Sequence, residues 1–376
     1  MKKNRQKNYI LNSLYINPTG RCNLKCRHCW INPYYSNDTG ASGNELKPGE
    51  IISIIKEARE LGLANIKLTG GEPLLRNDLE EVFEFCAKNG IKICIETNGT
   101  LIDRGKALLL KKYNVDFISL SLDGCNPSIN DSFRGVKGAF RMATDGIRNL
   151  VKAGFNPQVI TCLHRRNVEN FEKLAGLCKD LGVSSLKINP VMPVGKGKRL
   201  IKDKQNLGVK EILHFKNHIL PGIRNKFQYD IFIHLPPAFL SLKEIGKRGK
   251  CNIFGILGVL PDGNISICGI GFHVDELLFG KPLRDRGGLK RIWRENKKLN
   301  ELRKHVPDRL EGVCSKCIFK KICLGCCRAE VYYRDKNFYA PFWFCQESYK
   351  QGLFPESRLI PSTSDKGMPK RKIKQE

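Results

Sequence analysis

Three cysteines near the start of the chain have the spacing that points most directly to chemistry. Cys22, Cys26 and Cys29 lie in the segment GRCNLKCRHCW, separated by three and then two residues. Iron–sulfur clusters are normally held by four cysteine thiolates. Three thiolates so close together therefore leave one iron with an open position where a small molecule can bind. The alternative is a partial zinc site, but such a site needs a fourth ligand, and His28 is poorly placed to supply it.

A second cysteine pattern occupies the C-terminal third of the chain. The segment Pro261-Asp262-Gly263-Asn264 has the composition of a hairpin turn, which would fold Cys268 back toward Cys251. A zinc ribbon over residues 314–327 is the alternative to an iron–sulfur site. The full pattern consists of Cys251, Cys268, Cys314, Cys317, Cys323, Cys327 and Cys345.

Repeated strand–helix units must position these cysteines. Alternating apolar and amphipathic runs predict a parallel α/β sheet, curved or closed into a barrel. Six strands rather than eight favour an open, partial (β/α)6 TIM-like barrel. Strands are expected near 14–19, 65–69, 91–97, 116–121, 156–162 and 184–190, and helices near 47–62, 77–89, 103–112, 138–153, 167–181 and 209–220.

Unusual residues follow the ends of the first four expected strands. Cys22 follows the first strand, Gly70-Gly71-Glu72-Pro73 the second, Asn98 the third and Ser121 the fourth. Functional groups collect at the carboxyl ends of parallel strands. Paired glycines allow a close backbone approach to a ligand, and Glu72 supplies an acceptor for a protonated amine. The alternative is an ordinary βα turn with an exposed acid.

The cysteine loop followed by TGGEP resembles the radical S-adenosylmethionine enzymes. In that family the amino and carboxylate groups of S-adenosylmethionine bind the unique iron of a [4Fe-4S] cluster, and one electron cleaves the sulfonium to give a 5′-deoxyadenosyl radical. The resemblance implies that Glu72 contacts the methionine amino group, and that Ser121 and Arg134 hold its carboxylate. The alternative for Arg134 is a solvated surface charge. The alternative for Met192 is an apolar position in the core. The implied cofactor-binding residues are His28, Gly70, Gly71, Glu72, Asn98, Ser121, Arg134 and Met192.

The seven-cysteine pattern is similar to that of the SPASM domain, which carries two auxiliary [4Fe-4S] clusters. This resemblance assigns one complete set of thiolates, Cys314, Cys317, Cys323 and Cys345. It assigns only three to the other cluster, Cys251, Cys268 and Cys327. Cys326 is a possible substitute ligand, although neighbouring side chains rarely point at one metal. Buried apolar roles are expected for Cys86, Cys94, Cys125, Cys162 and Cys178.

Length, charge and composition indicate the location, the partners and the domain division of the protein. The chain has 376 residues and a formal charge of +28, and we find no secretory signal or membrane helix in its sequence. We therefore expect a cytoplasmic protein with reduced cysteines. The charge is spread over lysine-rich helices without a nucleic-acid-binding motif, which argues against a nucleic-acid partner. The expected division is 1–13 extension, 14–200 barrel, 201–250 bridge, 251–347 SPASM domain and 348–376 basic, disordered tail.

The resemblance also suggests a substrate. Most enzymes with this pattern modify peptides or proteins, and CRHCWINP is similar to the loop of Nif11-type leader peptide maturases. Expected partners are a precursor peptide and a reductant such as ferredoxin or flavodoxin. Because the segment before Cys22 is short, we expect no fused recognition domain, and we expect a separate leader-binding protein or the basic surface to bind the leader. Gly269 stands where sulfatase-maturating relatives carry an aspartate base. The alternative function is haem or quinone cofactor synthesis. A third possibility is a zinc and nucleic-acid-binding protein. We assign no catalytic residue.

Overall fold

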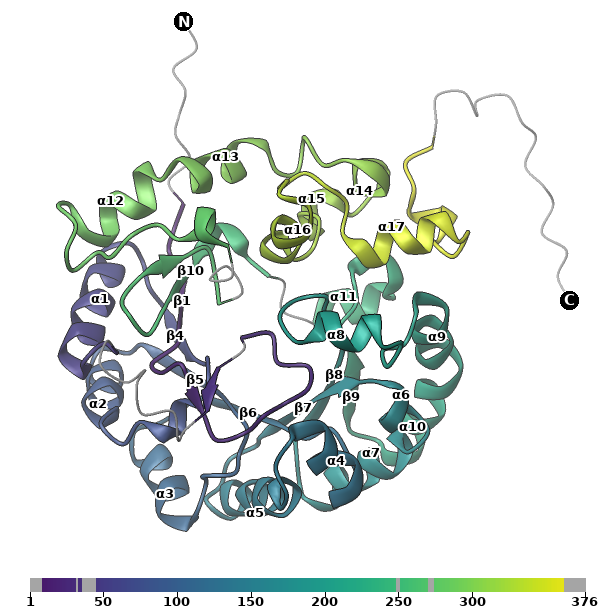
Figure 1. Cartoon of the computed structure of the whole chain (residues 1–376), viewed down its shortest axis with the longest axis horizontal. Helices are drawn as coiled ribbons and strands as arrows, with labels where there is room; N and C mark the ends of the chain where they lie inside the picture. The colour runs from purple at the N-terminus through teal and green to yellow at the C-terminus, as the bar shows by residue number, and fades with distance from the viewer. Residues whose placement is uncertain (1–8, 32, 36–44, 248–250, 270–273, 362–376) are drawn as a thin grey trace, which may run out of the picture.

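The structure is a computed structural model that describes residues 9–31, 33–35, 45–247, 251–269 and 274–361. Its centre is a nine-stranded sheet with the order β11-β10-β1-β4-β5-β6-β7-β8-β9 (Figure 1). The predicted parallel α/β sheet is confirmed. Its six expected strands are β1 (Ser13–Ile16), β4 (Asn65–Leu68), β5 (Lys92–Thr97), β6 (Phe117–Ser121), β7 (Gln158–Leu163) and β8 (Ser185–Pro190).

Three further strands extend the sheet at its two edges. β9 (Asp230–Ile233) comes from the expected bridge and pairs in parallel with β8. At the other edge, β10 (Ile256–Val259) pairs in parallel with β1, and β11 (Ile265–Ser266) runs antiparallel to β10. The predicted hairpin at 261–264 joins these last two strands. The C-terminal cysteine region thus begins inside the same sheet as the barrel strands.

Helices cover the outer side of the curved sheet and form a ring around it in Figure 1. The five expected crossover helices are present. Helix α4 was not predicted, although Asn126 is a recognisable N-cap whose Oδ1 accepts from Ile129 N at 3.0 Å, with a proline at the first helical position. The helices of this ring are α1 (Pro48–Glu60), α2 (Glu80–Lys88), α3 (Arg104–Lys112), α4 (Pro127–Arg134), α5 (Ala139–Lys152), α6 (Arg165–Val168) and α7 (Phe171–Asp180).

Between β8 and the C-terminal region the chain adds further helices. The helix expected near 209–220 begins at Val209, contains a π-helical turn at Phe215–Ile219 and continues to Phe227. Pro221 lacks a backbone N–H, and a widened turn just before it accommodates the missing hydrogen bond. The segments are α8 (Gly197–Lys202), α9 (Val209–His214), α10 (Leu220–Phe227) and α11 (Leu242–Lys247).

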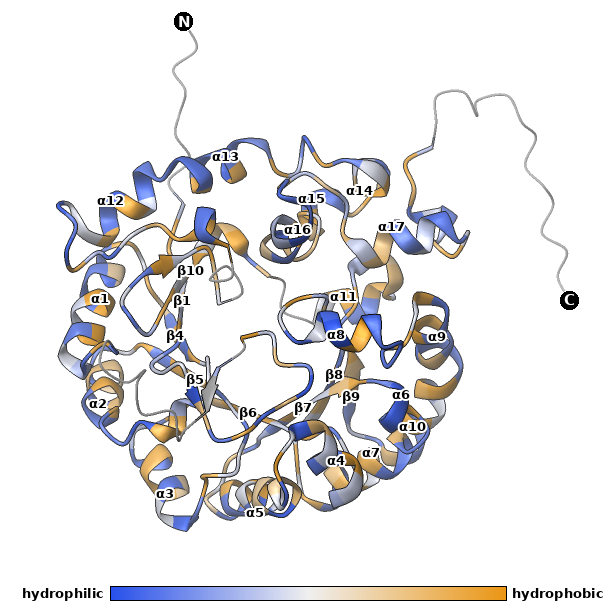
Figure 2. Cartoon of the chain, viewed as in Figure 1, coloured by the Kyte–Doolittle hydropathy of each residue, from blue (hydrophilic) through white to orange (hydrophobic). Residues whose placement is uncertain are grey.

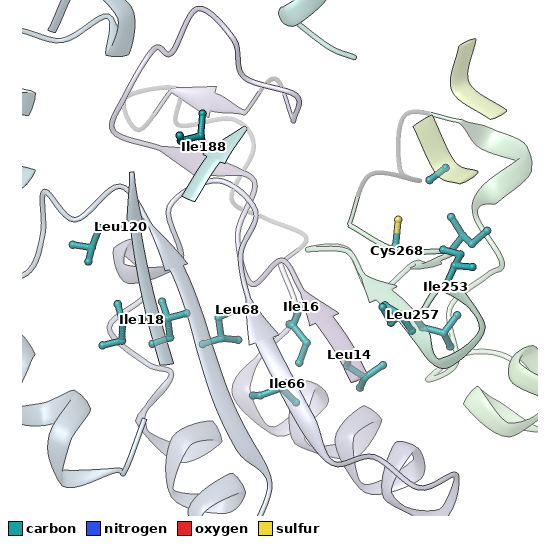
Figure 3. Packing of buried hydrophobic residues seen from close by; sticks show 14 of the residues in the cluster. Leu14, Ile16, Ile66, Leu68, Ile118, Leu120, Ile188, Ile253, Leu257 and Cys268 are labelled. Carbon is teal, nitrogen blue, oxygen red and sulfur yellow. The ribbon is translucent and has the colours of Figure 1, made fainter. Parts of the chain in front are cut away.

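The main core lies between the sheet and its helices. Alternate residues of the strands, such as Leu14, Ile66 and Ile118, are buried and project to one side of the sheet (Figure 3). The surrounding helices carry both hydrophobic and hydrophilic residues, as Figure 2 shows, which suits elements that cover a core on one face only. This core fixes the strand positions from which the site loops emerge.

The C-terminal helices lie across the gap between the two edges of the sheet in Figure 1. Beyond α17 the chain is more ordered than the sequence suggested, because Phe354 is buried and Ile318 N donates to Arg358 O at 2.9 Å. The basic run of the predicted tail lies outside the described residues. These helices are α12 (Gly288–Glu295), α13 (Lys297–His305), α14 (Gly312–Lys316), α15 (Lys320–Cys323), α16 (Arg328–Asp335) and α17 (Trp343–Lys350).

No helix in the described ranges combines the length and the apolar character that a membrane crossing requires.

Candidate functional site

The first cysteine loop is held close to the turn after β4. It begins at the short strand β2 (Arg21–Cys22) and lies over the middle of the ring of helices in Figure 1. Glu72 N donates to Arg21 O at 2.8 Å, and Gly71 N donates to Thr19 O at 3.2 Å. A Cβ atom at Gly71 would lie 1.9 Å from Arg21 O. Gly71 therefore permits a close approach between two chain segments, in addition to any approach to a ligand.

The sulfur atoms of this loop receive polar hydrogens from several directions. Leu24 N donates to Cys22 Sγ at 3.4 Å, and Asn98 Nδ2 lies 4.0 Å from the same sulfur. Arg134 Nη1 contacts Cys26 Sγ at 3.6 Å. Burial is the main reason that the pKa of Cys22 is raised to about 12, with smaller contributions from the charges of Glu72, Cys26 and Cys29. The three thiols are thus brought together, and donors that would stabilise thiolate ligands surround two of them.

Glu72 is completely buried and connects the ends of β4 and β5. Its Oε1 accepts from Leu74 N at 3.1 Å and from Thr97 Oγ1 at 2.7 Å. Its Oε2 accepts from Asn98 N at 2.7 Å. Burial raises the pKa of Glu72, while these three hydrogen bonds oppose the rise. The alternative of an exposed acid is excluded, and one of the roughly four carboxylate lone-pair sites remains open.

Arg134 is also buried, and an acid already faces it. Its Nη2 lies 2.6 Å from Asp123 Oδ2, and the side chains are only 7% and 0% exposed. Asp123 Oδ1 accepts in addition from Cys162 N at 2.7 Å. The alternative of a solvated surface charge is thus excluded. Arg134 Nε has no hydrogen-bond partner among the described residues, so the guanidinium retains a donor beside the cysteine loop.

A stack of three rings lies beside the loop. His28 stacks on Phe133 with ring centroids 4.6 Å apart, and Phe133 stacks on His164 at 3.8 Å. Burial lowers the pKa of His28 well below its usual range and that of His164 to about 4. Both imidazoles are thereby favoured in the neutral form. The flat neutral surface at His28 is compatible with the expected adenine contact.

The two remaining expected cofactor residues lie at the same edge of the sheet. Ser121 is the partly buried last residue of β6. Met192 is partly buried shortly after β8, and Lys196 of the same loop donates its N–H to Cys29 O at 2.9 Å. The loop that carries Met192 is therefore attached to the cysteine loop. This placement is compatible with a cofactor contact.

A polar group on the inner face of the sheet was missed by the sequence analysis. Lys67 Nζ lies 2.9 Å from Glu96 Oε1 and 4.4 Å from the ring centroid of Tyr15. Lys187 is close enough to Glu96 to lower the pKa of that carboxyl, after the larger effect of Lys67. The sequence does contain a signal for this polar group. Charged residues stand at alternate positions of otherwise apolar parallel strands, as in NIKL, ICIET and SLKIN.

The C-terminal cysteines form two neighbouring groups. Four of them line one apolar cavity, namely Cys314, Cys317, Cys323 and Cys345. A hydrogen bond from Cys345 lowers the pKa of Cys314 to about 6, and one from Cys326 lowers that of Cys323. The structure thus brings together the four thiols that the sequence assigned to one cluster.

The second group contains Cys251, Cys268 and Cys327. Burial raises the pKa of Cys327, and its thiol is close enough to Cys268 and Cys251 for their charges to add to the rise. Figure 3 shows Cys268 near Ile253 and Leu257, just beyond the hairpin. Within the described residues, no three His, Cys, Asp or Glu side chains converge closely enough for one metal ion. Of the five cysteines expected to be buried without a function, Cys86, Cys162 and Cys178 are buried, whereas Cys94 and Cys125 are only partly buried.

A larger cavity of about 840 Å³ lies at the β9 edge of the sheet. Four basic side chains and two acidic ones line it, and Arg224 pairs with Glu244 at 3.2 Å. Its basic lining residues are Lys187, Lys216, Arg224 and Lys243. An excess of positive charge favours an anionic ligand.

Comparison with solved structures supports this fold. The fold resembles SuiB of Streptococcus suis bound to precursor peptide SuiA, with a TM-score of 0.71, 18% identity, and coverage of 90% of this chain and 76% of SuiB. It also resembles anSMEcpe with bound AdoMet, with a TM-score of 0.70, 21% identity, and coverage of 90% and 95% of the two chains.

Sequence comparison identifies relatives of two kinds. An AdoMet-dependent heme synthase of Methanosarcina barkeri is 28% identical over 84% of this chain and 90% of its own. Mycofactocin maturase MftC of Mycolicibacterium smegmatis is 27% identical over 92% of this chain and 85% of its own. Residues 16–178 match the Radical SAM superfamily. This part of the chain, which carries the first cysteine loop and the ends of β4 to β6, is therefore a radical SAM domain.

Proposed function

We propose that this radical SAM enzyme modifies a ribosomally made precursor peptide. The observation that carries the proposal is the loop with Cys22, Cys26 and Cys29, held by hydrogen bonds at the carboxyl ends of parallel strands. The relative named mycofactocin maturase and the neighbour solved with a precursor peptide support a peptide as substrate.

The donor set of the first site fits an iron–sulfur cluster and S-adenosylmethionine. Cys22, Cys26 and Cys29 would hold one [4Fe-4S] cluster. When bound, the cluster and S-adenosylmethionine supply a 5′-deoxyadenosyl radical that can remove hydrogen from an unactivated carbon. The protein orients and shields this chemistry. The residues that would surround S-adenosylmethionine are His28, Gly70, Gly71, Glu72, Asn98, Ser121, Arg134 and Met192.

Each polar residue of this site has a definable task. Arg134 and Asn98 donate hydrogens toward cysteine sulfurs, and such contacts stabilise thiolates and influence cluster potential. Glu72 holds the turns after β4 and β5 together with three accepted hydrogen bonds. Its remaining lone pair would accept from the methionine ammonium. The stack of His28 on Phe133 would present a flat surface to adenine.

We further propose that residues 251–347 form a SPASM domain, joined by 201–250 to a barrel at 14–200. One auxiliary cluster would be held by the four thiols that line one cavity. The other would use Cys251, Cys268 and Cys327. A reductant of the ferredoxin or flavodoxin class would supply electrons, and either a separate leader-binding protein or the basic cavity would receive an acidic part of the peptide.

Haem synthesis is the second candidate function. It is favoured by relatives named AdoMet-dependent heme synthase, which match this chain at a similar level of identity. The basic cavity also suits the carboxylates of a tetrapyrrole. The two candidates share the radical chemistry and differ in the substrate that fills the inner face of the sheet.

Anaerobic reconstitution tests the cofactor proposal. We expect brown protein with about 12 iron and 12 sulfide per chain, from three four-iron clusters, and reductive formation of 5′-deoxyadenosine. Colourless protein with stoichiometric zinc would contradict it. The substrate is tested by adding either short precursor peptides encoded beside the gene or an iron coproporphyrin. A mass change in a peptide, with deuterium transfer from labelled peptide to 5′-deoxyadenosine, supports the peptide proposal, and a change in the tetrapyrrole alone overturns it.

A further inference from the structure

Cys326 does not face the group of Cys251, Cys268 and Cys327, although it precedes Cys327 directly. Its thiol donates a hydrogen bond to Cys323, which belongs to the four-cysteine group. Three successive residues, Leu324, Gly325 and Cys326, have left-handed backbone angles, with φ values of 55°, 75° and 63°. This turn directs the adjacent side chains of Cys326 and Cys327 to different groups. The three-thiol group therefore needs another candidate for a fourth ligand.

Glu330 lies on the same side of α16 as Cys327. Cys327 is the N-cap of α16 and Glu330 occupies the third helical position, so the two are three residues apart on one face. The backbone N–H of Glu330 donates to the sulfur of Cys327. Side chains in helices lean toward the N-terminus. Glu330 therefore lies beside the sulfur of Cys327, at the N-terminal end of α16.

The Glu330 carboxyl is buried without hydrogen bonds. The residue is 0% exposed, and neither Oε1 nor Oε2 has a hydrogen-bond partner in the described part of the chain. Arg334 Nη1 is 3.8 Å from Oε1, which is too far for a hydrogen bond, and the guanidinium of Arg334 pairs mainly with Asp335. Arg334 and Arg328 supply positive charge nearby, but a buried carboxyl without a hydrogen bond remains costly unless it coordinates a metal.

We infer that Glu330 is the fourth ligand of the auxiliary cluster held by Cys251, Cys268 and Cys327. The inference rests on the proposed function, because it requires that this cluster forms. On binding, one carboxylate oxygen would ligate the iron that lacks a thiolate, and any proton on the carboxyl would pass to solvent. Three thiolates and one carboxylate then close the cluster, which favours electron transfer over direct substrate binding at that iron.

The test uses the full chain with Cys22, Cys26 and Cys29 replaced by alanine, so that only auxiliary clusters contribute to the spectra. Anaerobic protein is reduced and compared by EPR with Glu330→Gln and Glu330→Cys, and Cys251→Ala identifies the signal of the three-thiol cluster. We expect Glu330→Gln to shift the g-values of that signal only. Glu330→Cys should restore a four-thiolate signal with unchanged iron content. It also keeps the inference testable if the glutamine variant does not fold.

Two control variants define the specificity of this test. Glu347→Gln changes an exposed carboxylate near Cys345 and should leave both signals unchanged. Cys326→Ala should leave the three-thiol cluster signal intact. The inference is overturned if Glu330→Gln and Glu330→Cys leave that signal unmoved, or if Cys326→Ala removes it. A starting protein without about eight iron per chain contradicts the auxiliary clusters themselves, whereas eight iron with unmoved signals contradicts only the role of Glu330.

Discussion

The two cysteine regions are built in different ways. Cys22, Cys26 and Cys29 belong to one short loop, which strand ends hold through backbone hydrogen bonds and the close contact at Gly71. The C-terminal thiols combine the short stretch 314–327 with the distant Cys251, Cys268 and Cys345, and they meet only after a hairpin and several helices have packed. The first region therefore depends on local spacing, and the second on tertiary structure.

The two cysteine regions also differ in the contacts that they require from surrounding residues. The first loop needs buried charges nearby, such as Arg134 with Asp123, to place donors at its sulfurs. The four-cysteine group instead lines an apolar cavity and makes hydrogen bonds between its own thiols. Variants that disturb the contacts around one cysteine region should therefore leave the other region largely intact.

The largest expected effect comes from removing the first thiols. Replacing Cys22, Cys26 and Cys29 by alanine should abolish reductive 5′-deoxyadenosine formation and remove about four iron per chain. The C-terminal clusters should remain, because their ligands are assembled separately. Product analysis by chromatography and iron determination measure both results. Loss of all iron would show that the two regions do not form independently.

Arg134→Ala should be the next most damaging change. It leaves Asp123 buried without its partner, which typically costs about 3 to 5 kcal/mol in unfolding free energy. S-adenosylmethionine affinity should fall as well, by about 1.5 to 3 kcal/mol if a charged hydrogen bond is lost. Denaturant unfolding and equilibrium binding measure the two effects. Arg148→Ala, which breaks an exposed pair with Asp145, is the matched control and should cost less than about 1 kcal/mol.

The ring stack predicts a pH dependence confined to the first region. The pKa of His164 is lowered by burial to about 4, from an ordinary value near 6.5. Its stabilising contribution is therefore present above about pH 6.5 and is lost as pH falls toward 4, with about 2 kcal/mol lost between pH 7.5 and 5. His164→Gln should reduce the difference in unfolding free energy between these pH values. The same difference in His164→Gln as in the wild type would contradict the prediction, and exposed His218→Ala serves as control.

The last effect, of similar size to that of His164, concerns the contact at Gly71. Gly71→Ala places a Cβ against Arg21 O and should destabilise the protein by about 1 to 3 kcal/mol, as overpacking usually does. Iron in the first site should fall while the C-terminal sites retain theirs. Gly49→Ala is the control, because nothing lies within 4 Å of its added Cβ. Equal thermal stability of both variants would show that the contact is not needed.

Sequence spacing predicted the parallel strands well, because the strand pattern is short-range. The strand ends that carry Cys22, Glu72 and Ser121 lie at one edge as expected. It did not predict that β10 joins β1 or that an acid faces Arg134, since both depend on contacts between distant segments. The opposite directions of Cys326 and Cys327 depend on a left-handed turn that composition alone does not specify.

The pairing of β10 with β1 has a consequence for dissecting the protein. β1 pairs with β4 on its other side, so a chain ending before Cys251 would leave its β10-facing backbone groups without partners. Such an exposed strand edge is a template for aggregation. A fragment limited to the first domain would therefore be prone to self-association, and residues 251–266 protect the barrel even before any metal binds.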